Sequence, residues 1–302
     1  MNPSDSFKEK SYQKHADHFR DYAEGGKLSE HAKTWMCQDT VDSWRHQRMH
    51  QLLDPVLEMD PSSQWLTVGD GRYGRDAKYI SEKKGKVIAS DISEYLLKEA
   101  KDNGYIEEYK VENAEDLTFE DESFDYVFCK ESYHHFPRPF IALYEMLRTA
   151  RKGVILIEPN DEFLSEKWTG TFFRNFKNFI KKLSGKNVQK HMFEDSGNYL
   201  YSLSKREIEK LALGLGFRMI ASQGINDAYY KGGENEKLSE RGTIQTKTKR
   251  LLTIKNLFTR LGLMDHGILA VIIFKKTPSV AMINSLQIRG YSMTDLPLNP
   301  YA

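Results

Sequence analysis

The chain has 302 residues, of which 39% are hydrophobic and 12% aromatic, so it can build a substantial core and is not expected to be disordered. Forty-four Lys and Arg against 43 Asp and Glu give a net charge of +1, which does not favour nucleic acid as a partner. Two cysteines, far apart at Cys37 and Cys129, argue against a disulfide framework, and neither a signal peptide nor a membrane span is predicted.

Residues 1–60 are predicted to form a polar helical extension that precedes the main domain. From 61 to 276, short apolar runs alternate with helical stretches, which predicts a parallel sheet with helices on both faces. Strands are expected at 65–68, 87–90, 106–111, 124–128, 153–157, 217–220 and 267–274. Insertions at about 161–200 and 231–262 interrupt this alternation, and 277–302 is predicted to be an irregular tail.

A glycine-rich turn follows the first of these strands. Its sequence, Gly69-Asp70-Gly71-Arg72-Tyr73-Gly74, is followed by Asp91 at the end of the second strand. Glycines let a ligand approach the N–H groups at the start of a helix, and an acid at this spacing accepts hydrogen bonds from ribose hydroxyls. The pattern predicts an adenosine-bearing cofactor, but it suits a dinucleotide and a cofactor with a carboxylate equally well.

Residues 111–159 separate these two possibilities. They run from "NAEDL" (113–117) through "ESFDYVF" (122–128), a loop with two histidines, and "EMLR" (145–148) to the apolar run "GVILIEP" (153–159). With the glycine turn and Asp91, this order resembles the class I S-adenosylmethionine-dependent methyltransferases over residues 65–160. The resemblance implies a doubly wound, Rossmann-like, seven-stranded and mostly parallel α/β sheet, with a helical extension and an inserted cap, and S-adenosyl-L-methionine as the cofactor.

The same resemblance assigns cofactor contacts. Gly69 and Gly71 are expected against the methionine and ribose, and Asp91 at the ribose hydroxyls. Asp70 is a candidate for the methionine amino group, because Thr67 stands where the family often has an acid. The expected cofactor-binding residues are Gly69, Asp70, Gly71, Gly74, Asp91, Ile92 (adenine), Asn113, Ala114, Glu115 (adenine edge) and Lys130.

The catalytic candidates are His134, His135 and Glu158, which follow the fourth and fifth strands. Methyl transfer needs a base only when the acceptor must lose a proton, and an imidazole titrates near neutrality. For each of the three, a purely structural role is the alternative. No metal site is expected, and His15, His18, His31, His46 and His50 are predicted to be polar surface groups.

The two insertions contain basic amphipathic segments, at 171–186 and 248–262. Such helices can lie on an anionic membrane, and the alternative is that their apolar stripes pack on their own domain. Together with the N-terminal helices, they are expected to form a lid over the acceptor.

The predicted function is methyl transfer to a small-molecule, sugar or lipid-linked acceptor, with oxygen favoured as the methylated atom. "TVDSWRHQRM" (40–49) resembles methyltransferases of bacterial polysaccharide and cell-surface sugar pathways. The expected location is cytoplasmic, with peripheral membrane contact as an extension of it. The alternatives are an NAD(P)-dependent oxidoreductase and a non-catalytic binding module. A nucleic-acid methyltransferase is disfavoured, because Lys-Glu-Ser-Tyr (130–133) replaces its usual motif. The oligomeric state stays open.

Overall fold

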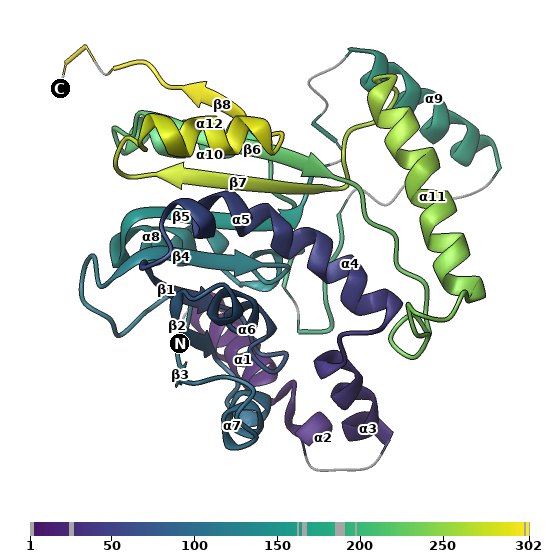
Figure 1. Cartoon of the computed structure of the whole chain (residues 1–302). Helices are drawn as coiled ribbons and strands as arrows, with labels where there is room; N and C mark the ends of the chain where they lie inside the picture. The colour runs from purple at the N-terminus through teal and green to yellow at the C-terminus, as the bar shows by residue number, and fades with distance from the viewer. Residues whose placement is uncertain are drawn as a thin grey trace.

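A central eight-stranded sheet organises the chain, with the strand order β3-β2-β1-β4-β5-β7-β6-β8 (Figure 1). The computed structural model describes residues 3–23, 27–161, 163–164, 168–184, 191–196, 198–298 and 300–301. The strands are β1 (Gln64–Val68), β2 (Lys86–Asp91), β3 (Tyr109–Val111), β4 (Phe124–Lys130), β5 (Ala150–Pro159), β6 (Met219–Ile225), β7 (Ile268–Phe274) and β8 (Ser292–Asp295). β1 to β5 run parallel, whereas β7 is antiparallel to both its neighbours. The predicted mostly parallel, doubly wound sheet is confirmed.

Helices bury both faces of this sheet, as the alternation of side chains along β5 illustrates. Val154 and Leu156 pack into a cluster with α8 (Pro139–Thr149) and α10 (Lys205–Gly214). Ile155 and Ile157 point to the opposite face, toward α5 (Asp54–Met59) and α12 (Val280–Ile288). Because successive residues of a strand face opposite sides, a strand covered on both sides reads as a continuous apolar run. A third cluster joins α6 (Arg75–Glu82) and α7 (Tyr95–Asp102) to the N-terminal helices.

Helices also precede the sheet. They are α1 (Pro3–Asp17), α2 (Arg20–Ala23), α3 (Lys27–Lys33), the 3-10 turn η1 (Thr34–Met36), α4 (Val41–His50) and the 3-10 turn η2 (Gln51–Leu53), before α5. α4 begins at a capping box, in which Thr40 accepts from the Ser43 N–H and Ser43 accepts from the Thr40 N–H.

Two histidines of α4 are buried, so the prediction of polar surface groups is wrong for them. His50 Nε2 lies 2.7 Å from Asp76 Oδ1, and His46 Nδ1 lies 3.2 Å from Glu131 Oε2. α4 packs between the end of β4 and the start of α6, where its polar side chains meet carboxylates instead of water. Burial lowers the pKa of His50 to about 4, so this imidazole is neutral at pH 7.

The two insertions form a lobe away from the sheet. α9 (Trp168–Leu183) lies between β5 and α10 in the chain, and α11 (Thr243–Arg260) lies between β6 and β7. Both helices lie in this lobe (Figure 1), and Thr169 Oγ1 donates a 2.6 Å hydrogen bond to the Gly262 carbonyl. Residues 185–186 of the first predicted segment lie outside the described residues. Within the described part of the chain, no helix combines the length and hydrophobicity needed to cross a bilayer.

The prediction of an irregular tail is also wrong, because residues 277–302 contain α12 and β8. Ser279 Oγ accepts from the Met282 N–H and caps α12, which buries Met282 and Leu286 against the sheet. β8 then pairs antiparallel with β6 and becomes the eighth strand. β8 has four residues and a polar sequence, so its place in the sheet depends on pairing with a distant strand and not on a local apolar pattern.

Candidate functional site

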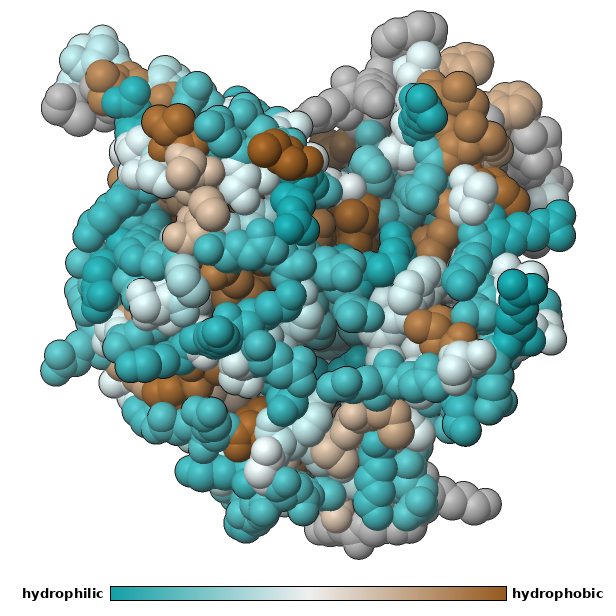
Figure 2. Space-filling model, in the orientation of Figure 1, coloured by the Kyte–Doolittle hydropathy of each residue, from teal (hydrophilic) through white to brown (hydrophobic). Residues whose placement is uncertain are grey.

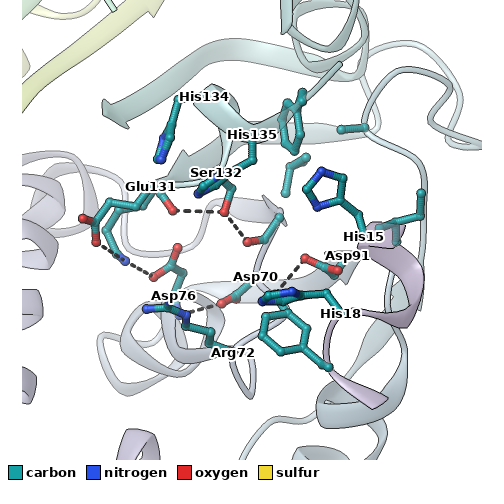
Figure 3. A pocket seen from close by; sticks show the side chains of 18 of the residues that line it. His15, His18, Asp70, Arg72, Asp76, Asp91, Glu131, Ser132, His134 and His135 are labelled. Carbon is teal, nitrogen blue, oxygen red and sulfur yellow. Dashed lines mark hydrogen bonds and ion pairs between the residues drawn. The ribbon is translucent and has the colours of Figure 1, made fainter. Parts of the chain in front are cut away.

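A cavity of about 970 Å³ opens at the carboxyl ends of β1, β2 and β4. β1 lies between β2 and β4, so this is where the strand order reverses and where doubly wound sheets bind ligands. Figure 3 shows the cavity, with His15 and His18 on one side and Glu131 and Asp76 on the other. The predicted residues that line it are Gly69, Asp70, Gly71, Asp91, Ile92, Asn113, Ala114, Glu115, Lys130, His134 and His135. Gly74 and Glu158 are not among its lining residues.

The glycine turn brings the backbone of β1 close to its neighbours. Gly69 has φ +76, and a Cβ there would lie 2.4 Å from the Ser132 Cβ. A Cβ on Gly71 would lie 2.4 Å from the Phe19 ring and 2.8 Å from the Asp91 carboxyl. Gly74, at φ +63, starts α6 and would place a Cβ 2.9 Å from Ile106. The first two glycines keep the wall of the cavity free of side chains, whereas Gly74 permits close packing of α6.

Replacing Gly69 by Ala is expected to destabilise the protein by at least about 2 kcal/mol and to weaken cofactor binding. The added methyl group would require both a left-handed backbone and displacement of Ser132. The matched control is Gly104→Ala, which also has a positive φ, +68, but has no atom within 4 Å of the added Cβ. We expect the control to lose only about 1 kcal/mol in urea unfolding. Equal losses in the two variants would contradict the steric argument.

The Asp70 carboxylate accepts hydrogen bonds from N–H and hydroxyl groups of its own chain. It accepts hydrogen bonds from the N–H groups of Asp76 (3.1 Å) and Ala77 (2.9 Å), and from Thr67 Oγ1 (2.9 Å). Burial and the neighbouring Asp76 raise its pKa well above the ordinary value. It supplies the acceptor for the first turn of α6, because Gly74 at the N-cap has no side chain. A contact from Asp70 to the methionine amino group stays a prediction.

Asp91 lies at the end of β2 and faces the same cavity. Its Oδ2 accepts from the Gly71 N–H at 2.9 Å, and its Oδ1 accepts from the Ser93 N–H at 2.8 Å. Burial raises the pKa of this carboxyl to about 6. Each carboxylate oxygen can accept a second hydrogen bond, so Asp91 can still bind two hydroxyls of a ligand.

The turn at Asn113-Ala114-Glu115 closes another side of the cavity. Asn113 Oδ1 accepts from the Glu115 N–H at 3.0 Å and fixes the turn. Glu115 is buried: it accepts from Tyr12 of α1 (2.7 Å) and from the Arg138 N–H (2.8 Å), and it pairs with the Arg138 guanidinium. Glu115 therefore fastens α1 over the cavity, and its carboxylate is largely used by protein partners.

Lys130 belongs to a network of charges in the wall of the cavity. Its ammonium lies 3.2 Å from Asp76 Oδ1 and 3.8 Å from Glu131 Oε2. Glu131, which is not among the predicted site residues, follows β4 directly and adopts a left-handed backbone with φ 51. Its contact with His46 and the charge of Lys130 hold the pKa of Glu131 well below its usual range. A strained backbone that presents an ionised carboxylate is typical of a functional position.

Glu158 is completely buried and holds His134. Its Oε2 lies 2.6 Å from His134 Nδ1, and its Oε1 accepts from the N–H groups of Ser132 (2.9 Å) and Tyr133 (3.0 Å). The negative charge of Glu158 raises the pKa of His134 above its ordinary value despite burial. The carboxylate accepts a hydrogen bond from the Nδ1–H, so in the neutral imidazole the lone pair is on Nε2. Among the described residues, Nε2 has no hydrogen-bond partner.

His135 differs from its neighbour although their ring centroids are 3.9 Å apart. Its Nδ1 bonds to Glu194, and its carbonyl accepts from Asn198 at 2.7 Å. Burial and the adjacent His134 lower the pKa of His135 to about 3, so this imidazole is neutral at pH 7.

A second cavity, of about 340 Å³, shares both histidines with the first. Its other walls include Phe163, Tyr199 and Tyr201, and the two tyrosine rings meet edge to face with centroids 5.0 Å apart. The two histidines thus stand in a wall between a polar cavity and an aromatic one.

The N-terminal helices contribute side chains that the site predictions omitted. Tyr12, His15, His18 and Phe19 line the large cavity, and so does Arg72 of the glycine turn. Arg72 lies over the Trp35 ring at 5.1 Å from its centroid. The only signal in the sequence was the presence of aromatic residues and histidines within otherwise polar helices.

Comparisons with known proteins place this site in a family. Residues 66–157 match the family model described as a methyltransferase domain, and no curated protein sequence matches the chain. A putative methyltransferase from Bacillus halodurans is 22% identical, with a TM-score of 0.43 over 74% of this chain and 99% of its own. A SAM-dependent methyltransferase from Thermotoga maritima, a possible histamine N-methyltransferase, is 20% identical, with a TM-score of 0.42 over 74% and 88%. TM-scores this low do not identify a family, so the family assignment depends on the match of residues 66–157 to the family model.

The site fits the cofactor of that family. The bare backbone at Gly71, the half-buried Asp91 carboxylate and the Ala114 turn offer what a ribose and an adenine require: close approach, acceptors for hydroxyls, and a backbone N–H at the cavity wall. The volume of the cavity also lies within the range of cofactor sites. Residues 66–157 therefore form a class I methyltransferase domain, and its cofactor is S-adenosylmethionine.

Proposed function

We propose that this chain methylates a hydroxyl oxygen of its acceptor, with His134 as the general base. The observation that carries the proposal is the contact between His134 Nδ1 and the buried Glu158 carboxylate, at 2.6 Å, in the wall between the two cavities. When bound, S-adenosylmethionine supplies a methyl group on a positively charged sulfur. The residues of the chain must then orient the acceptor, exclude water and remove its proton.

His134 is suited to removing the proton of the acceptor. Glu158 fixes the tautomer and the ring orientation, so that the Nε2 lone pair is available to a hydroxyl. The raised pKa makes the imidazole a stronger base for removing the proton of a hydroxyl. His135 is expected to position the acceptor, because its low pKa makes it a weak base.

The second cavity is the proposed acceptor site. Tyr199 and Tyr201 offer aromatic faces, and Ser202 and Asp161 offer polar groups beside them. Stacking on an aromatic ring combined with hydrogen bonds at the edge suits a hydroxylated ring, which favours a sugar. The rim residues Phe163 and Met192 are 36% and 53% exposed, so a lipid-linked sugar is also compatible. Such an acceptor would bring the enzyme to the inner face of the membrane.

The domain arrangement is part of the proposal. Residues 1–60 and the insertion at 161–200 are proposed to close the site, with 61–276 as the domain that binds the cofactor. Two contacts support this role: Tyr12 donates to Glu115, and Asn198 Nδ2 lies 2.9 Å from His15 Nε2. α1 is thereby tied both to the cofactor cavity and to the segment beside the histidines.

The test is to measure release of S-adenosylhomocysteine with sugars, sugar nucleotides and lipid-linked glycans as acceptors, each compared with its deoxy analogue. We expect turnover only with an acceptor that carries the hydroxyl, and mass spectrometry should find the new methyl group on oxygen. Turnover with amines alone would contradict O-methylation. Binding of the cofactor without turnover on any acceptor would favour a non-catalytic module.

A further inference from the structure

The lobe formed by α9 and α11 concentrates positive charge. α9 carries Arg174, Lys177, Lys181 and Lys182, α11 carries Lys247, Lys249, Arg250, Lys255 and Arg260, and neither helix has an acidic residue. The whole chain carries a net charge of only +1, so the rest of it has a net charge of −8. A nearly neutral protein thus presents one strongly basic element, which indicates an anionic partner for this lobe.

The same lobe exposes large apolar side chains. On α9, Phe172 is 67% exposed, Phe176 52% and Phe179 58%. Their spacing of four and then three residues places the three rings on one face of the helix. Figure 2 shows hydrophobic residues gathered over these two helices. Three neighbouring exposed phenylalanines are an unusual feature, because single exposed apolar residues are normal but contiguous apolar stripes mark interaction sites.

α11 also exposes apolar side chains, beside others that pack on the domain. Its buried residues are Leu252 and the polar Gln245, Thr248 and Thr259. Its exposed residues include Ile254, and Leu257 and Leu261 farther along the same stripe are 53% and 59% exposed. Packing on the domain buries Leu252 and partly covers Ile244, Leu251 and Phe258, in a helix that still directs the apolar stripe of Ile254, Leu257 and Leu261 outward.

We propose that the α9/α11 lobe binds the anionic surface of a lipid bilayer, with its apolar stripes in the interface and its Lys and Arg side chains at the headgroups. Charge alone would suit a nucleic acid as well. The outward Phe, Ile and Leu side chains favour lipid, because they can be buried in the apolar part of a bilayer. A phosphate backbone has no apolar region in which they could be buried. The inference does not depend on the methyl transfer proposed above.

Sedimentation of the full-length protein with vesicles tests this inference. The vesicles contain phosphatidylcholine alone, or phosphatidylcholine with phosphatidylglycerol. We expect at least about tenfold stronger partitioning to the anionic vesicles, and a loss of this partitioning at high salt. Binding to neither vesicle, or equal binding to both, would overturn the proposal.

Variants separate the two components of binding. Phe172→Ser combined with Phe176→Ser should reduce partitioning by about tenfold or more, and Lys247→Gln combined with Arg250→Gln should remove the preference for anionic lipid. The matched control is Ile141→Ser combined with Tyr144→Ser on α8, where the side chains are 39% and 50% exposed. The control should bind like the wild type. If instead the Phe172/Phe176 variant bound vesicles normally but lost a dimer seen by light scattering, the lobe would be a self-association surface and the proposal would fail.

Turnover on a water-soluble acceptor distinguishes this proposal from the methyl-transfer proposal. It should be unchanged in the Lys247/Arg250 variant, because these two side chains line neither cavity and lie outside the insertion that is proposed to close the site. Lipid binding in a chain that transfers no methyl group would still support the lobe inference.

Discussion

Replacing His134 by Asn is expected to lower kcat with a hydroxyl acceptor by about 10²- to 10⁴-fold, with little change in the affinity for S-adenosylmethionine. Asn can still donate to Glu158, which lies 2.6 Å from His134 Nδ1, so the loop should keep its shape. What the variant loses is the Nε2 lone pair that would take the acceptor proton. The measurement is S-adenosylhomocysteine release at saturating cofactor, together with a separate titration of cofactor binding.

The pH profile tests the same assignment. Because the base must be unprotonated, kcat/KM of the wild type should rise with pH through the pKa of His134, which Glu158 holds above 6.5. Glu158→Gln keeps an oxygen for the Ser132 and Tyr133 N–H groups but removes the negative charge. The pKa of His134 should then fall, and both the midpoint of the profile and the maximal rate should decrease.

His191→Asn is the control for these variants. His191 also lines the second cavity, but its ring bonds to the Tyr199 hydroxyl at 3.5 Å and not to a buried carboxylate. We expect a loss of no more than about tenfold, without a shift of the profile. A His134→Asn variant that kept the wild-type rate and profile would eliminate His134 as the base.

The sheet could be predicted from the sequence because its strands carry their own signal. β4, β5 and β7 are buried on both faces and therefore appear as short continuous apolar runs between glycines and polar turns. β8 lacks such a signal: its four residues are exposed or half-buried, and only pairing with β6 makes them a strand. Local patterns describe a strand in the core better than a strand at an edge.

The site was predictable where chain order determines proximity. In a parallel sheet, the carboxyl ends of neighbouring strands meet at one edge, so Gly69, Asp91 and Lys130 could be expected in one cavity. Contacts across long separations were not predictable in this way. Tyr12 and Glu115 are 103 residues apart, and no local pattern links them. The same holds for the histidines of α4, whose burial depends on carboxylates supplied by other elements.

Glu158 shows a further limit of sequence reasoning. Its position after β5 suggested a catalytic or acceptor-binding carboxylate, but the structure places it outside the lining of the large cavity with four partners. Its burial and its contact with His134 favour the proposed role of holding that ring, which only the geometry could distinguish from direct catalysis.

Replacing Asp91 by Asn is expected to weaken binding of S-adenosylmethionine by about 10- to 100-fold without destabilising the protein in the absence of cofactor. The half-buried carboxyl has a pKa of about 6, against an ordinary value of 3.8. The folded protein thus keeps a proton that the unfolded chain has already lost, so stability falls as the pH rises from about 4 to about 6. Above this range the ionised carboxylate costs on the order of 3 kcal/mol.

An asparagine side chain at this position would not ionise, so the variant does not have this ionisation cost. It loses an acceptor oxygen, which reduces hydrogen bonding to the ribose hydroxyls and to one of the N–H groups of Gly71 and Ser93. At pH 8 without cofactor, we therefore expect urea unfolding of Asp91→Asn to require as much denaturant as the wild type, or more. Saturating S-adenosylmethionine should stabilise the wild type strongly and the variant weakly, because ligand stabilisation follows affinity. Asp116→Asn is the control, since Asp116 is exposed beside the same cavity turn, and it should change neither quantity. If Asp91→Asn lost stability without cofactor and kept its affinity, Asp91 would be a structural residue and not a ligand for the ribose.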